Sequence, residues 1–147
     1  MVQEYQNWGE QFKIEFDIKI TKLPTENRNV LHFTANDKDC CDNGNRIPAV
    51  YVLGDKLKVI SSISGNYNYE AVSFACVLEQ MYHVIIQQYK GLTGDYWFEI
   101  IIDDESKCKI LNKFQRSFSN VKFYASNPWL DPFSSEFGSI GNITIGK

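Results

Sequence analysis

The chain has 147 residues, which fits one domain large enough to bury a core of its own. Its formal net charge is -3 with both signs interspersed, so we expect no basic stripe of the kind that nucleic acid or an anionic membrane requires. No apolar run approaches the roughly 20 residues that span a bilayer. These features predict a single soluble domain over residues 1–147, with no nucleic-acid partner and no membrane insertion.

Apolar and polar residues alternate along most of the chain. The pattern is clearest between Phe12 and Ile20, where every second residue is apolar, so one face of a strand enters a core and the other meets water. Similar patterns, several joined as hairpins, cover residues 29–35, 49–63, 66–77, 79–89, 96–102, 107–111, 120–126 and 138–146. With about ten strands and no convincing helix, the sequence predicts an all-β fold, a two-sheet antiparallel β-sandwich or jelly roll.

Three segments carry a resemblance to a known fold. They are IEFDIKI (residues 14–20), VKFYASNPW (121–129) and GSIGNITI (138–145), in an order that returns the last strand beside residues 12–20. The pattern resembles a concanavalin A-like jelly roll of the laminin-G and galectin kind, and NRIPA with ASNPW resembles secreted modules of marine invertebrates. The resemblance implies a recognition domain whose ligand is a carbohydrate or another protein.

Two motifs of that fold are incomplete in this chain. Galectins bind galactosides through His-x-Asn-x-Arg and a downstream Trp-Gly-x-Glu, but His32 opens HFTAND with no arginine at the matching place. Laminarinase-type glycosidases use Glu-x-Asp-x-Glu on one strand, whereas Glu15-x-Asp17 is followed here by Lys19. Retaining hydrolysis requires a second carboxylate about 5 Å away. We therefore expect neither galectin-type lactose binding nor an enzyme.

A polar loop, NDKDCCDNGNRIP at residues 36–48, separates two predicted strands. Calcium takes about six to eight oxygen ligands, and carboxylates and amides lie close together in this loop, although not at EF-hand spacing. One hypothesis is a Ca²⁺ site at the rim of the sandwich, held by Asp37, Asp39 and Asp42. The alternative is a solvated loop that a cysteine anchors.

The four cysteines are Cys40, Cys41, Cys76 and Cys108. They show no Cys-x-x-Cys spacing, and only two histidines accompany them, so structural zinc is not expected. A bond between adjacent cysteines forces a strained eight-membered ring, which predicts separate partners for Cys40 and Cys41, or one free thiol. Four reduced thiols in a cytoplasmic protein are the alternative to an extracellular or secreted protein whose signal peptide is absent from this sequence.

Aromatic and amide residues gather in two further segments, around residues 66–68 and 127–129. Carbohydrate sites commonly pair a stacking ring with side chains that bind hydroxyls. Trp129 has a structural alternative, since it could close one end of the sandwich. The predicted ligand-binding residues are Asp42, Asn43, Asn45, Arg46, Asn66, Tyr67, Asn68, Asn127 and Trp129.

The function expected is that of an extracellular, non-catalytic, lectin-like module that binds a glycan or glycoprotein, with or without Ca²⁺. The alternative is an adhesive or structural laminin-G-like domain that binds protein through a sheet face or edge. Its interface candidates are the polar positions of the first clear strand, Lys13, Glu15, Asp17 and Lys19.

Overall fold

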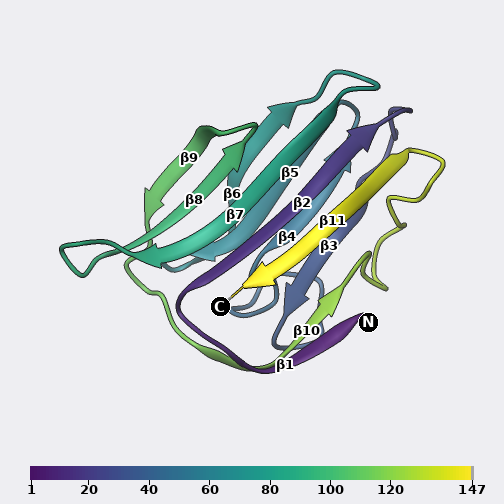
Figure 1. Cartoon of the computed structure of the whole chain (residues 1–147). Helices are drawn as coiled ribbons and strands as arrows, with labels where there is room; N and C mark the ends of the chain where they lie inside the picture. Colours follow the sequence, from purple (N-terminus) through teal and green to yellow (C-terminus); the bar gives the residue numbers. More distant parts are fainter. Residues whose placement is uncertain (147) are drawn as a thin grey trace.

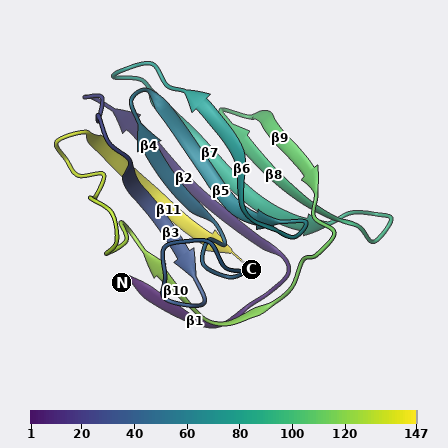
Figure 2. The same ribbon diagram turned by 180° about the vertical axis from the view of Figure 1, so that it is seen from behind.

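A computed structural model describes residues 1–146, which contain strands and loops but no helix. No helix that could cross a bilayer is found in this range. Two antiparallel sheets pack face to face (Figures 1 and 2). The predicted all-β, two-sheet sandwich is therefore confirmed.

Sheet A contains six strands. In spatial order they are β1 (Gln3–Trp8), β10 (Phe118–Tyr124), β3 (Arg28–Thr34), β4 (Ala49–Leu53), β5 (Lys56–Ile63) and β6 (Asn66–Ala75). Sheet B contains five, namely β11 (Gly138–Gly146), β2 (Phe12–Ile20), β7 (Met81–Lys90), β8 (Tyr96–Ile102) and β9 (Glu105–Leu111).

Alternation along the strands builds the core between the sheets. On β2 every second side chain, from Phe12 to Ile20, is buried against sheet A, while the residues between them face outward. The same period runs along β5, β7 and β8. β11 pairs antiparallel with β2, as expected for the last strand (Figure 1).

The expectations missed β1. Its sequence, QEYQNW, is mostly polar and lacks strict alternation. The strand forms because it pairs with β10 from Gln3 to Trp8, and because Trp8 packs between Phe12 and Phe33 in the core. Trp8 contributes to a site described below.

Three connections meet at one end of the sandwich. They are the loop 36–48 after β3, the turn 64–65 between β5 and β6, and the segment 112–117, which crosses from β9 in sheet B to β10 in sheet A. The Asn112 side chain accepts a hydrogen bond from the Ser64 N–H (2.9 Å), and the Ser64 hydroxyl donates to the Leu111 carbonyl (2.8 Å). These bonds fix the turn and the crossing segment relative to each other.

Candidate functional site

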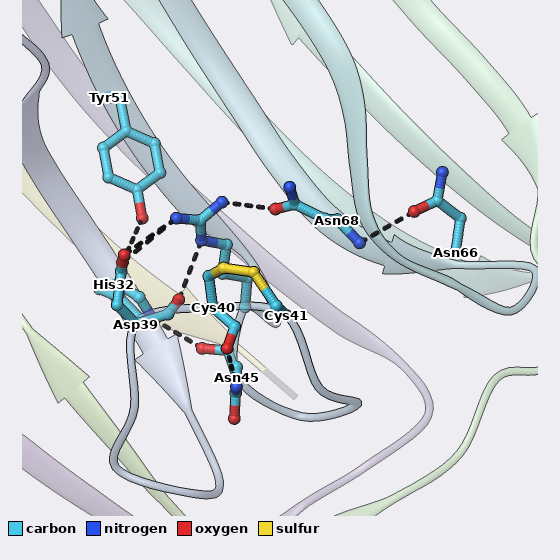
Figure 3. Close-up of a disulfide and its surroundings, with 9 residues drawn as sticks. His32, Asp39, Cys40, Cys41, Asn45, Tyr51, Asn66 and Asn68 are labelled. Carbon is cyan, nitrogen blue, oxygen red and sulfur yellow. Dashed lines mark hydrogen bonds and ion pairs between the residues drawn. A yellow bond between two sulfur atoms is a disulfide. The ribbon is translucent and has the colours of Figure 1, made fainter.

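Loop 36–48 is fixed to the outer face of sheet A by Arg46, which is only 9% exposed. Its guanidinium donates to the Asp39 carbonyl (2.9 Å), to both Asp39 carboxylate oxygens (3.2 Å each) and to the Asn68 side chain on β6. Tyr51 on β4 donates its hydroxyl to the same carboxylate (3.1 Å), and burial raises the pKa of that phenol (Figure 3). The network is internally paired, and it ties the loop to β4 and β6.

The three aspartates of the calcium hypothesis do not converge. Asp37 accepts hydrogen bonds from the Lys122 ammonium (2.7 Å) and the Tyr124 hydroxyl on β10, and these bonds hold its pKa below the usual value. Asp39 is paired with Arg46, and Asp42 is exposed. Across residues 1–146, no three His, Cys, Asp or Glu side chains are grouped closely enough to hold a metal ion. Calcium binding by this loop stays a prediction.

The cysteine pairing differs from the expectation. Cys40 and Cys41 form a disulfide with each other (Figure 3). Cys76 and Cys108 are free thiols. The expectation of separate partners was wrong because Cys76 follows the end of β6 that is far from Asn68, the residue in contact with the loop, and Cys108 lies on β9 in the other sheet. Burial raises the pKa of the Cys76 thiol to about 11.

Two of the predicted ligand-binding amides are inside the fold. His32 on β3 is fully buried, with its Nε2 bonded to the Asn45 carbonyl (2.6 Å) and its Nδ1 to the Asn127 amide (2.8 Å). The Asn45 side chain is bonded to Asn36 and Cys40. The chain's own loops thus cover His32, and Asn45 and Asn127 have their amide groups committed to holding those loops.

The other predicted residues divide between two surfaces. Trp129 is half-buried on the outer face of sheet A, where it packs edge-on to His32 and Tyr124. Arg46 and Asn68 contact each other on that same face. Asn66 is exposed and accepts a hydrogen bond from the Asn68 N–H (3.0 Å), and Asp42 is exposed in the loop. Asn43 and Tyr67 lie elsewhere, on the wall of a pocket at the end of the sandwich.

This end pocket lies where the three connections meet, and its volume is about 530 Å³, which is within the range of small-molecule sites. Two aromatic rings border it, Tyr67 (43% exposed) and Phe114 (71% exposed). The Ser62 hydroxyl donates to the Asn43 side chain (3.2 Å), which positions that amide. The complete lining is Asn43, Ser62, Gly65, Tyr67, Lys113, Phe114, Gln115 and Arg116.

A narrower inner recess of about 20 Å³ shares Asn43, Ser62, Phe114, Gln115 and Arg116 with the end pocket. Room of this size holds about one water-sized group. Trp8, which is 1% exposed, lines it, and its indole N–H has no hydrogen-bond partner among the described residues. A buried donor without an acceptor costs about 1–3 kcal/mol. The Trp8 N–H is therefore an unsatisfied donor on a residue that lines the recess.

The crossing segment was not predicted as part of a site. Lys113, Phe114, Gln115 and Arg116 all line the end pocket, yet no candidate site residue was named between the predicted strands 107–111 and 120–126. A signal was present, because NKFQR places an aromatic residue among polar and basic ones in a loop, where an apolar side chain gains nothing from folding.

No protein-family model matches the chain, and no curated protein matches its sequence. Solved structures do share its fold. The alginate lyase Aly36B is similar over 98% of this chain and 72% of its own, with a TM-score of 0.59 and 13% identity. The heptameric SAP-like pentraxin of Limulus polyphemus covers 98% of this chain and 66% of its own, with a TM-score of 0.62 and 16% identity.

A third similar structure is domain 4 of AbnA, an extracellular GH43 arabinanase from Geobacillus stearothermophilus, in complex with arabinotriose. It covers 97% of this chain and 64% of its own, with a TM-score of 0.58 and 17% identity. At such identities the comparisons show the fold alone. The concanavalin A-like jelly roll implied by the sequence motifs is confirmed.

Proposed function

We propose that this domain binds a glycan without catalysing a reaction on it, and that the end pocket is its binding site. One observation carries the proposal: two exposed aromatic rings, Tyr67 and Phe114, border a pocket of about 530 Å³ beside an amide held by Ser62. A sugar presents an apolar C–H face and a rim of hydroxyls, so it needs a ring to stack on and polar groups to bond.

The structural neighbours support a carbohydrate ligand. Among them, the AbnA domain is solved in complex with arabinotriose, an Aly36B mutant with alginate tetrasaccharide, and a binding domain of botulinum neurotoxin DC with SialylT. Lyases share the fold too, so the fold is compatible with catalysis. The end pocket is lined by amide, hydroxyl, aromatic and basic groups and lacks the pair of carboxylates that glycosidases use, so its chemistry favours binding over glycoside hydrolysis.

The test is binding to a glycan array, followed by titration of the strongest ligand into single variants. Phe114→Ala and Tyr67→Ala should each weaken binding about tenfold, which corresponds to the loss of one stacking ring. Both rings are exposed, so the free energy of unfolding should change by less than about 0.5 kcal/mol.

Leu78→Ala is the matched control. Leu78 is also an exposed apolar side chain, but it precedes Glu79, whose N–H bonds the Ile20 carbonyl at the opposite end of the sandwich. Its removal should leave affinity unchanged. Glycan binding that survives both aromatic substitutions would exclude the end pocket as the site.

A protein-binding role is the second candidate. Lys13, Glu15, Asp17 and Lys19 do face outward on β2, and His83 on the adjacent strand β7 is bonded to Asp17 (2.7 Å). These groups form a charged, solvated sheet face. If no glycan binds and the protein self-associates in sedimentation experiments, this role would replace the glycan-binding proposal.

The calcium dependence of glycan binding and the cellular location of the protein are part of the same proposal. We propose a secreted or extracellular protein, which the Cys40–Cys41 disulfide supports because disulfides persist in oxidising compartments. The glycan array run in millimolar calcium and again in a chelator tests the metal. Equal glycan binding in both conditions would show that binding does not depend on calcium.

A further inference from the structure

The end pocket has a charge that differs from that of the whole protein. The chain carries a formal net charge of -3, yet the lining of the end pocket contains two cations, Lys113 and Arg116, and no carboxylate. A smaller neighbouring hollow shares Lys113 and contains one carboxylate, Asp95, which accepts a hydrogen bond from the Thr93 hydroxyl (3.0 Å). The positive charge is therefore greatest on the Arg116 side of the end pocket.

These two cations lack the ion pairs that several other cations of the fold form. Arg46 is paired with Asp39, and Lys122 with Asp37. Neither Lys113 nor Arg116 forms an ion pair within residues 1–146. Their charges are consequently available to a ligand.

Arg116 is also held in place. Its guanidinium lies 5.2 Å from the centre of the Phe118 ring, a cation–π contact that positions the group without neutralising it. A planar guanidinium binds a carboxylate or sulfate through two parallel hydrogen bonds. Beside it, Trp8 lines the inner recess. The unpaired guanidinium favours a ligand rich in acceptor oxygens.

We propose that the end pocket selects acidic oligosaccharides, in which a sugar ring carries a carboxylate or a sulfate. The anionic group binds Lys113 and Arg116, and the ring packs on Tyr67 and Phe114. This inference rests on the proposed glycan binding and names its ligand class.

The test uses ligand pairs that differ only in charge. Trigalacturonate is compared with its methyl ester, and a sulfated disaccharide with its desulfated form, by titration at low and at high salt. We expect the acidic member to bind at least about tenfold more tightly, and added salt to reduce the difference because it screens exposed charges. A preference for the carboxylate or for the sulfate supports the proposal and identifies the group.

Variants connect the preference to the pocket. Lys113→Gln and Arg116→Gln should each weaken binding of the acidic ligand about fivefold and leave the neutral ligand unaffected. Lys56→Gln is the control, because Lys56 begins β5 at the end opposite the turn 64–65 and pairs with Asp55, away from the pocket. It should change neither affinity.

The two proposals fail in different ways. Equal binding of neutral and acidic ligands, with no effect of the glutamine variants, would overturn the acidic preference and leave glycan binding intact. No binding of either member of both pairs, together with a silent glycan array, would overturn both proposals.

Discussion

His32 shows how one buried side chain connects two loops to sheet A. Its Nε2 bonds to the Asn45 carbonyl, which can only accept, so this nitrogen carries the proton; its Nδ1 then accepts from the Asn127 amide. The Asn127 oxygen is already used by the N–H groups of Trp129 and Leu130. A second proton on His32 would therefore face a donor in a buried site, which agrees with a pKa lowered by burial to about 4.

This arrangement makes stability depend on pH. The unfolded histidine binds a proton near pH 6.5 but the folded one only near pH 4, so the unfolded state holds more protons between these values. The contribution of His32 to the free energy of unfolding is complete above pH 6.5 and is lost as the pH falls through 4. The total loss is about 3 kcal/mol. Unfolding in denaturant at a series of pH values should show this loss, and a His32→Gln variant should lack it.

The carbon-bound ring protons of His32 give a direct check by NMR. A titration midpoint near pH 4 is expected. A midpoint near pH 6.5 would contradict the buried, neutral assignment. Carboxylates with lowered pKa values, such as Asp17 and Asp37, also lower the free energy of unfolding when acid protonates them. Comparing the wild-type protein with the His32→Gln variant separates the effect of His32 from theirs.

Single residues were the hardest feature to predict from the sequence. Asn43 and Asn45 have the same side chain two positions apart, yet one lines the end pocket and the other is fully buried. The difference depends on the path of the loop, which the bond between Arg46 and Asn68 and the bond between Asn45 and His32 determine. Neither contact is local in sequence. The composition of the loop could therefore predict that the loop is a candidate site, but not which of its residues face a ligand.

Among the elements, loop 36–48 is stabilised by two kinds of interaction. The Cys40–Cys41 disulfide closes a very small ring, and the entropy removed from the unfolded chain grows with the length of the closed loop. Arg46, by contrast, links Asp39 in the loop to Asn68 on β6. The arginine network is thus expected to stabilise the loop more than the disulfide does.

Two variants test whether the arginine network stabilises the loop more than the disulfide does. The double variant Cys40→Ser with Cys41→Ser should lower the free energy of unfolding by about 1 kcal/mol. Arg46→Gln should lower it by about 2 kcal/mol, because the partly buried Asp39 carboxylate loses its cation. Thermal unfolding of both proteins under the same conditions measures the difference. A larger loss in the serine variant would contradict the assignment.

The pairing of β11 with β2 depends on a close backbone approach. A Cβ added at Gly138 would lie 1.9 Å from the Lys19 carbonyl oxygen, where only backbone movement could relieve the clash. Gly138→Ala should therefore cost more than about 2 kcal/mol. Gly141→Ala, on the same strand with nothing within 4 Å of the added atom, is the control and should change stability by less than about 1 kcal/mol.

Most strands were predictable because one face of each is buried. Alternation identified β2, β5, β7 and β8, where the period of two persists over seven or more residues. It failed for β1, whose burial comes from Tyr5 and Trp8 alone, and it gave no information about residues 112–117, which are held by turns and side chains of other segments.

At the scale of the whole molecule, the fold does not determine the function. The concanavalin A-like jelly roll occurs in lyases and in a binding domain, so the architecture alone does not select an activity. The candidate site of this chain lies at the end where loop 36–48, the turn 64–65 and residues 112–117 meet. Two exposed rings, two unpaired cations and a buried indole N–H are concentrated there.

The three tryptophans allow one direct test of the end pocket. Trp8 lines the inner recess, Trp129 lies on the outer face of sheet A, and Trp97 contacts Lys109 on sheet B. We would titrate an acidic oligosaccharide into the ¹⁵N-labelled protein and follow the three indole N–H resonances. Glycan binding at the end pocket should shift the Trp8 resonance saturably and leave Trp97 unchanged. Saturable binding that moves Trp129 or Trp97 while Trp8 stays fixed would contradict it.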